Sequence, residues 1–203
     1  MTPVAAAPLP KPESQNSISE APPKIVAIMF ADAKGFSKLT EEQTPLFVRH
    51  FLEMVGEMAH AVRPPGRQPP AMMNTWGDGL FFIFENVSDA AGFALDLCDR
   101  VRDAAWAEKG LPGLGVRIGL HAGPAHPFID PVTQRPNFIG THISQAARIE
   151  PITPPNEVYA SQHFAALAAM DPAKTFNCEY VGKTPLAKDF GTFPMYVVRR
   201  RAD

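Results

Sequence analysis

The sequence predicts an α+β fold, in which helices cover a mainly antiparallel central sheet. Strand-like and helix-like patterns are interleaved along the chain, and two adjacent strand-like stretches at 72–84 read as a hairpin. The chain has 203 residues, of which 45% are hydrophobic and 20% are charged. This composition suits one globular domain with a tail.

The tail is residues 1–23, which are rich in Pro, Ala and Ser and show no periodicity. We expect it to form a disordered or polyproline-like arm. The domain is expected over residues 24–203. Its first strand begins near Lys24 and continues as the apolar run 25–30. Because no polar residue interrupts this run, we expect a central strand that is covered on both faces.

The first long helix follows a start signal. Thr40-Glu41-Glu42-Gln43 resembles a capping box, and Pro45 suits the first helical turn. Pro64-Pro65-Gly66 then predicts the end of the helix. Between these signals apolar residues recur at helical spacing, namely Phe47, Phe51, Met54, Val55, Met58 and Val62.

The hairpin at 72–84 has Trp76-Gly77-Asp78-Gly79 at its tip. Ser88 is the predicted cap of a second helix, in which apolar residues repeat every four positions. Residues 116–121 alternate as a strand. A proline-rich loop leads from there to Gly140.

The last part of the chain predicts a short helix over 143–149 and strands over 157–160 and 195–198. The four histidines in this half of the chain carry no signal of a metal site. His121 lies in an apolar strand, where a histidine is expected to be a hydrogen-bonded core group, and His126, His142 and His163 lack ligand-like spacing with one another.

The charge balance excludes some classes of partner. Nineteen Lys and Arg residues stand against 21 Asp and Glu residues, so the formal net charge of −2 favours neither nucleic acid nor an anionic membrane surface. No apolar run approaches the roughly 18–20 residues that span a bilayer, and no secretory signal is recognisable. Cys98 and Cys178 lack metal-type spacing, and a reduced, cytoplasmic protein is expected.

Two aspartates are the most informative residues. Asp32 follows the first predicted strand, and Asp78 lies at the hairpin tip, each with a glycine within a few residues. A carboxylate at a strand end is not buried unpaired without a free-energy cost of several kcal/mol. Hard divalent cations relieve that cost, because they take oxygen ligands from carboxylates and phosphates together. The pair therefore favours a two-metal phosphoryl-transfer site.

Four segments, in this order, resemble class III nucleotidyl cyclases, the adenylate and guanylate cyclases. They are Phe30-Ala31-Asp32-Ala33-Lys34-Gly35-Phe36-Ser37, Gly77-Asp78-Gly79, Val116 to Pro124, and Ala146-Ala147-Arg148-Ile149. The resemblance covers roughly residues 24–198. It implies the sandwich fold of this family, with the active site at a dimer interface.

The resemblance implies an activity and its cofactors. The family converts a nucleoside triphosphate into a 3′,5′-cyclic nucleotide and pyrophosphate, and its metal ligands correspond to Asp32 and Asp78. Two divalent cations, Mg²⁺ or Mn²⁺, are implied, one to lower the pKa of the ribose 3′-hydroxyl and one to neutralise phosphate charge. Gly35, Phe36 and Ser37 would offer backbone N–H groups to the triphosphate.

Further residues match the family's substrate contacts. Arg148 corresponds to the arginine that stabilises charge on the α-phosphate, a task that suits a permanently charged guanidinium. Lys188 corresponds more loosely to a lysine that reaches the triphosphate. In the family one domain supplies the metal ligands and the other supplies the arginine and the base contacts. This chain carries both sets, so the resemblance implies a homodimer with two shared sites.

Three positions depart from the family pattern. Asn74 and Asn137 stand where ATP-using members have lysine and aspartate and GTP-using members have glutamate and cysteine. An amide both donates and accepts hydrogen bonds, so it does not assign the base. Ser144 replaces a ribose-orienting asparagine and has a shorter reach.

Two explanations of these departures remain open. One is an altered base, since pyrimidine cyclases of bacterial anti-phage signalling also lack the purine selectors, which favours UTP or CTP over relaxed use or ATP. The other is a catalytically weak or inactive domain that binds nucleotide and regulates a partner. The presence of Asp32, Asp78 and Arg148 favours an active enzyme.

Overall fold

The computed structural model describes residues 22–62, 65–172 and 175–201. The predicted arm over 1–23 therefore lies outside the described residues as far as residue 21. The strands are β1 (Lys24–Lys34), β2 (Met72–Trp76), β3 (Gly79–Phe84), β4 (Gly115–Ile129), β5 (Pro136–Ile139), β6 (Glu157–Ser161), β7 (Phe176–Pro185) and β8 (Thr192–Arg200). The helical segments are η1 (Phe36–Lys38), α1 (Thr44–Phe47), η2 (Val48–Leu52), α2 (Glu53–His60), α3 (Val87–Asp103), α4 (Thr141–Ala146), η3 (Glu150–Ile152) and α5 (Gln162–Met170).

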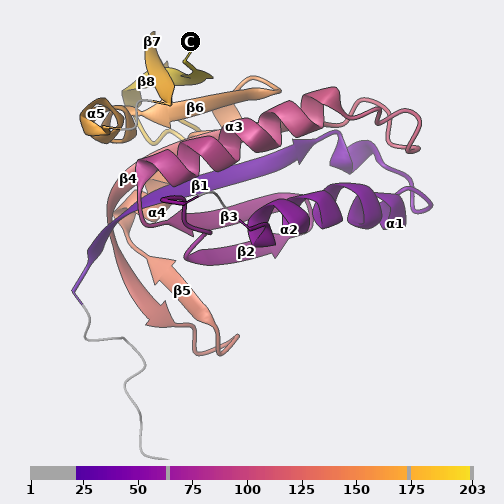
Figure 1. Ribbon diagram of the computed structural model, residues 1–203, viewed down its shortest axis with the longest axis horizontal. Coiled ribbons are helices and arrows are strands. Elements are labelled where there is room, and N and C mark those ends of the chain that lie inside the picture. The colour runs from indigo at the N-terminus through magenta and orange to yellow at the C-terminus, as the bar shows by residue number, and fades with distance from the viewer. Residues whose placement is uncertain (1–21, 63–64, 173–174, 202–203) are drawn as a thin grey trace, which may run out of the picture.

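The central sheet has the strand order β2-β3-β1-β4-β6-β8-β7, and β5 pairs with β4 beside this path. The β4–β6 pair is parallel, and the other pairs are antiparallel. Figure 1 shows α3 lying across the sheet, with α1 and α2 beside it and with β5 and the end of β4 projecting as an arm. The predicted α+β class with a mainly antiparallel sheet is confirmed.

Strand β1 is covered on both faces, as its uninterrupted apolar run predicts. Ala27 and Met29 belong to the larger core, in which α1, α2 and α3 pack on one face of the sheet. Val26 and Ile28 point the other way and belong to a smaller core with Ala146 of α4. Side chains alternate along a strand, so α4 lies on the face opposite α3. Asp32 shares the alternation of Val26 and Ile28, which places it on the α4 face.

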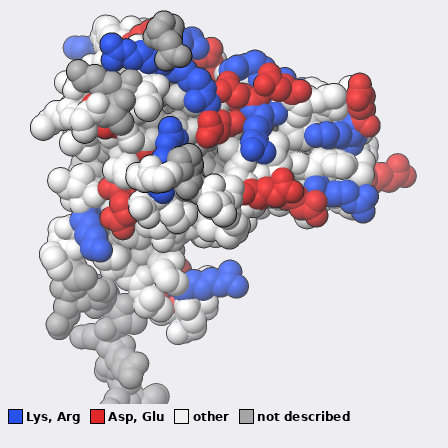
Figure 2. All heavy atoms as spheres, in the orientation of Figure 1, with Lys and Arg blue, Asp and Glu red and all other residues white. Residues whose placement is uncertain are grey.

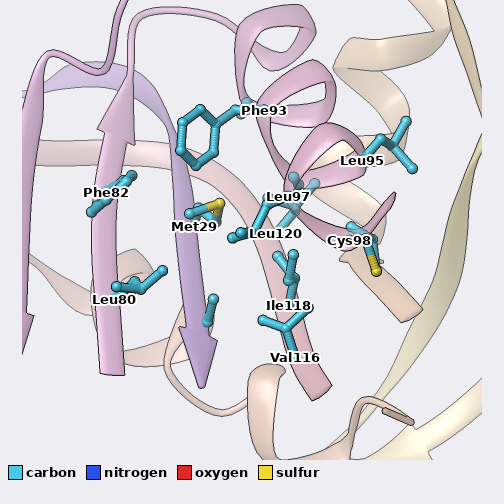
Figure 3. Close-up of a cluster of buried hydrophobic side chains, with 14 of the residues drawn as sticks. Met29, Leu80, Phe82, Phe93, Leu95, Leu97, Cys98, Val116, Ile118 and Leu120 are labelled. Carbon is cyan, nitrogen blue, oxygen red and sulfur yellow. The ribbon is translucent and has the colours of Figure 1, made fainter. Parts of the chain in front are cut away.

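Interdigitated aliphatic and aromatic side chains fill the larger core. Figure 3 shows Phe93 and Leu97 of α3 directed toward Met29 of β1 and Phe82 of β3. All four are at most 2% exposed. Burial of such a side chain contributes about 1.5–3 kcal/mol, so this layer holds α3 and the strands that carry the candidate site in a fixed relation.

Two predicted boundaries are wrong. The cap of α3 is Asn86 and not Ser88, because the Asn86 side chain accepts the backbone N–H of Asp89 at 2.8 Å and so satisfies a donor of the first turn. Ser88 lies inside the helix, and its hydroxyl donates to Asp171. The short helix predicted at 143–149 begins at Thr141 and ends at Ala146, after which turns continue the chain into η3.

The proline-rich loop predicted before Gly140 is also wrong. Strand β4 continues to Ile129, and β5 returns from Pro136 to pair with it. Pro136 is the first residue of this short edge strand, a position at which the missing N–H is tolerated. The sequence pattern also missed β7, most of whose residues are exposed. The first long helix does form, as α1, a π-helical segment η2 and α2. The helix ends at His60, before the predicted stop at Pro64-Pro65-Gly66, of which Pro64 lies outside the described residues.

Within the described ranges, no helix is both long enough and apolar enough to cross a membrane. Figure 2 shows Lys and Arg side chains interspersed with Asp and Glu on the face that it draws, rather than gathered in a continuous basic stripe.

Candidate active site

The fold brings Asp32 and Asp78 together at one end of two paired strands. Asp32 lies opposite Gly79 in the β1–β3 register, and Gly79 directly follows Asp78. The backbone N–H of Ala33 donates to the carbonyl of Asp78 at 3.2 Å. Gly77, at the tip, has a φ of +67°, a left-handed conformation that glycine adopts without strain. The pairing of the two aspartates predicted from the sequence is therefore a consequence of strand register.

The two carboxyl groups interact directly. The pKa of Asp78 is raised first by burial, then by the charge of Asp32, and further by a hydrogen bond to the Asp32 side chain. A hydrogen bond to the backbone of Asp78 and the charge of Arg117 oppose this increase. Arg117 lies opposite Asp32 in the β1–β4 register, and its guanidinium donates to Asp32 Oδ2 at 2.6 Å.

A third carboxylate completes this charge cluster. Glu150 Oε1 lies 2.9 Å from Arg117 Nε, as an ion pair without the alignment of a hydrogen bond. The Glu150 side chain is 14% exposed. Burial raises its pKa to about 7, with Arg117 opposing the shift and Asp32 and Asp78 adding to it. Arg117 and Glu150 have no predicted role from the sequence, although both lie in or beside the segments that carry the resemblance.

A cavity of about 570 Å³ opens beside this cluster. Asp32, Asp78 and Arg117 line it, together with Gly35 and Ser37. The remaining lining residues are Ala33, Lys34, Lys38, Leu39, Gln43, Pro112 and Gly113.

Gly35 turns the chain from β1 into η1, with a φ of +100° that favours glycine. In η1 the amides of Lys38 and Leu39 bond back to the carbonyls of Gly35 and Phe36. The first amides of such a turn have no acceptor within it. The Phe36 ring packs edge-on against Phe47, with ring centroids 4.7 Å apart. Phe36 would therefore contact a ligand through its backbone N–H, as expected from the sequence.

The other predicted residues do not line this cavity. Ser144 is exposed on α4, and Arg148 follows that helix. The carbonyl of Arg148 accepts the amide of Ala187 at 3.5 Å, so the Lys188 loop lies against the Arg148 backbone. Lys188 and Asp189 both have positive φ values, of 58° and 53°. The structure thus forms a second group of predicted residues around α4.

The two predicted base contacts lie on different strands. Asn74 is exposed on β2. Asn137 lies on β5, where its amide donates to Asp130 at 3.3 Å and its side-chain oxygen accepts the N–H of Phe138 at 2.8 Å. Asp130 also accepts the backbone amides of Val132 and Thr133, which lower its pKa. The Asn137 side chain is therefore held on the arm by a local network.

His121, His142 and His163 gather on the α4 face of the sheet. His121 is fully buried, as predicted for a core histidine. Its Nδ1 lies 2.7 Å from Ser161 Oγ, and its Nε2 lies 2.8 Å from His142 Nδ1. His163 of α5 contacts both rings edge-on. Burial, His142 and His163 lower the pKa of His121 to about 3. Sequence spacing missed this cluster because it joins β4, α4 and α5.

The donor set at Asp32 and Asp78 fits divalent cations. Two neighbouring carboxylates repel each other when both are ionised, and a hard cation with oxygen ligands relieves that repulsion. In the part of the chain that the structure describes, no three His, Cys, Asp or Glu residues converge on one metal position. These two carboxylates would therefore hold a cation together with oxygens from other sources, such as backbone carbonyls, substrate phosphates or water.

Comparison with solved structures shows the same fold in cyclases. The adenylyl cyclase CyaB from P. aeruginosa matches with a TM-score of 0.73 and 17% identity, over 89% of this chain and 96% of that chain. The guanylate cyclase domain of RhGC from Catenaria anguillulae, in complex with GTP, matches with a TM-score of 0.71 and 16% identity, over 88% and 98%. At these identities the likeness shows the fold.

Sequence comparison gives the family. An adenylate cyclase from Lachancea kluyveri is 28% identical in an alignment 159 positions long, which covers 70% of this chain and 8% of that protein's length. Residues 18–199 match the family model of the adenylate and guanylate cyclase catalytic domain. Because this match spans nearly the whole chain, the chain belongs to the adenylate and guanylate cyclase catalytic domain family, whose members are phosphorus–oxygen lyases.

Proposed function

We propose that this chain is an active nucleotide cyclase, which converts a nucleoside triphosphate into a 3′,5′-cyclic nucleotide and pyrophosphate. One observation carries the proposal. Asp32 and Asp78 meet beside Arg117 on a cavity whose wall includes the Gly35 turn. Paired carboxylates, a cation and a glycine turn are the groups that a metal-bound triphosphate requires.

Asp32 and Asp78 would hold two divalent cations, Mg²⁺ or Mn²⁺. When bound, these cations lower the pKa of the ribose 3′-hydroxyl and neutralise charge on the triphosphate. Arg117 would transfer from Asp32 to a phosphate oxygen, since a guanidinium pairs with either oxyanion. The amides of Phe36 and Ser37 would donate to the triphosphate.

A second copy of the chain would complete each site. The cavity at Asp32 lacks Arg148, Ser144 and Lys188, which the structure places around α4 instead. A homodimer with twofold symmetry brings the α4 group of one chain to the cavity of its partner, at two equivalent sites. Arg148 would then stabilise charge at the α-phosphate, and Ser144 would face the ribose.

The base is the finer part of the proposal. Asn74 and Asn137 are proposed to face it, and the lack of purine selectors favours UTP or CTP. ATP is the alternative, and the curated relative, which is an adenylate cyclase, favours it. The comparisons give no support to an anti-phage role, which rests on the resemblance to the pyrimidine branch alone. A freely diffusing product would suit signalling in the cytoplasm.

The rival proposal is a nucleotide-binding domain that regulates a partner without turnover. Ser144 favours it, because its exposed hydroxyl reaches less far toward a ribose than the asparagine of relatives. Metal-dependent product formation separates the two proposals.

The test is an incubation of the purified chain with ATP, GTP, CTP and UTP in the presence of Mn²⁺, with products resolved by chromatography. We expect one predominant cyclic nucleotide, and no product from the Asp32→Ala variant. The identity of the cyclic nucleotide that the wild-type chain forms assigns the base. No product from any of the four nucleotides would refute the enzymatic proposal and favour the regulatory one.

Shared sites require a separate experiment. Asp78→Ala and Arg148→Ala should each abolish activity as homodimers, whereas the mixed dimer should regain one intact site. A mixed dimer as inactive as its parents would refute the shared-site arrangement.

A further inference from the structure

The segment that carries Ser144 and Arg148 lies directly on strand β4. A Cβ on Gly119 would lie 2.6 Å from the backbone nitrogen of Glu150, and a Cβ on Gly123 would overlap the His142 ring. Gly119 is needed at this contact, because any side chain there would displace the backbone of the turn after α4, whereas a side chain at Gly123 would displace the His142 ring. The peptide after Arg148 is therefore held against the sheet.

Glu150 contacts β4 in two ways. Its backbone lies on Gly119, and its side chain pairs with Arg117, two residues earlier on the same face of the strand. Ile149, just before it, is fully buried and packs with Leu186 and Met195. Arg148 is thus joined to a peptide that is held on the sheet by the contact with Gly119, by the burial of Ile149 and by the Glu150–Arg117 pair.

Arg117 also pairs with the candidate metal ligand Asp32, at 2.6 Å. One guanidinium therefore lies between the carboxylate that would bind metal and the glutamate that follows Arg148. If Arg117 moves to a phosphate, as proposed above, Glu150 would lose its cationic partner, and one of the contacts that hold the peptide after Arg148 would be broken. The chain of contacts runs from Asp32 through Arg117 and Glu150 to Arg148.

We infer that Glu150 is a positioning residue that couples the two active sites of the dimer through a single chain. The inference rests on the proposed shared-site function. In that arrangement, Asp32 and Arg117 serve one site, while Arg148 of the same chain serves the other. Occupation of one site would then shift the arginine that serves the second site and so change kcat there, an effect on turnover that need not be symmetric between the sites.

The mixed dimer isolates this coupling. The Arg148→Ala chain supplies Asp32, Asp78 and Arg117 of the one intact site, and the Asp78→Ala chain supplies its Arg148. Arg117→Ala is then added to the Asp78→Ala chain alone. In that chain Arg117 belongs to the inactive site, so an effect on the intact site must pass through the protein.

We expect Arg117→Ala in the Asp78→Ala chain to lower kcat of the intact site about tenfold. A small displacement of Arg148, which contacts the transition state there, has an effect of this size or larger. KM should not change. The affinity for a 3′-deoxynucleoside triphosphate, measured by calorimetry with the base that the turnover assay identifies, should not change either. Glu150→Gln in the same chain should lower kcat equally, and the two substitutions together should add nothing.

Glu157→Gln in the same chain is the matched control. Glu157 pairs with Arg199 at 3.1 Å on the surface, so its substitution breaks a comparable ion pair and should leave kcat unchanged. Melting temperatures report whether Arg117→Ala has unfolded its chain. If it has, the nearly isosteric Glu150→Gln decides the question.

The possible failures are distinguishable. An inactive parent mixed dimer refutes the shared-site function before any coupling is measured. An active parent whose kcat is unchanged by Glu150→Gln overturns the coupling, as do additive effects of the two substitutions.

Discussion

Acidification should destabilise this protein through one buried histidine. His121 is fully buried between Ser161 and His142, and its pKa is lowered to about 3. Burial is the largest cause, and the neighbouring His142 and His163 add to it. The unfolded chain therefore binds a proton between pH 6.5 and 3 that the folded chain does not, and the free energy of unfolding falls as the pH falls through this window.

The magnitude follows from the shift. One such proton changes the free energy of unfolding by about 1.4 kcal/mol per pH unit, so His121 should remove about 3 kcal/mol between pH 8 and pH 4.5. Glu150 acts in the opposite sense, because its pKa is raised to about 7 and its contribution weakens as the pH rises from 4.5 to 7. The wild-type curve alone therefore mixes several effects, because the pKa of His142 is also lowered and that of Asp78 is also raised.

The assay is urea unfolding of wild type and His121→Asn at fixed protein concentration, from pH 8 to pH 4.5 in EDTA. The Glu150 contribution is common to both proteins, so the difference between their free energies of unfolding isolates His121. We expect this difference to shrink by about 3 kcal/mol on acidification, from the same linkage. A difference that does not vary with pH would refute the reasoning.

Substitutions at Gly119 and Asp78 give two further predictions. Gly119→Ala should destabilise the chain by about 1–3 kcal/mol, because its methyl group would lie 2.6 Å from the Glu150 nitrogen, whereas Gly56→Ala on α2 meets nothing within 4 Å and should stabilise slightly. Equal melting temperatures for the two variants would contradict the close packing. Asp78→Asn should raise the melting temperature of the metal-free protein at pH 7 while abolishing cyclase activity, because it removes the buried charge and its repulsion with Asp32, which together raise the Asp78 pKa. A lower melting temperature would show that the carboxylate stabilises the fold.

Local patterns predicted the elements that position the site. The uninterrupted apolar run at 25–30 predicted a strand covered on both faces, and β1 has cores on each side. Tip glycines on either side of Asp78 predicted the hairpin, and the register of that hairpin with β1 places Asp78 beside Asp32. These features are readable because side-chain periodicity and turn chemistry act over a few residues.

The cap of α3 and the short edge strand β5 were not predicted correctly from the sequence. Asn86 and Ser88 are both good capping residues, and only the backbone shows which of them precedes the first helical turn. Strand β5 is short, lies at an edge and begins with proline, so its composition resembles that of a loop. The arm forms because the extended β4 supplies the pairing partner.

The sequence by itself determined the α+β class, the two aspartates and the segments that place the chain among the cyclases, since these depend on local residue order. Only the tertiary structure decided that Arg117 joins Asp32 to Glu150, that His121, His142 and His163 meet, and that Arg148 lies apart from the cavity at Asp32 and Asp78. Asp32 and Arg117 are 85 positions apart, and strand register alone brings them within 2.6 Å. No periodicity encodes such a pair, because its geometry is a property of the assembled sheet.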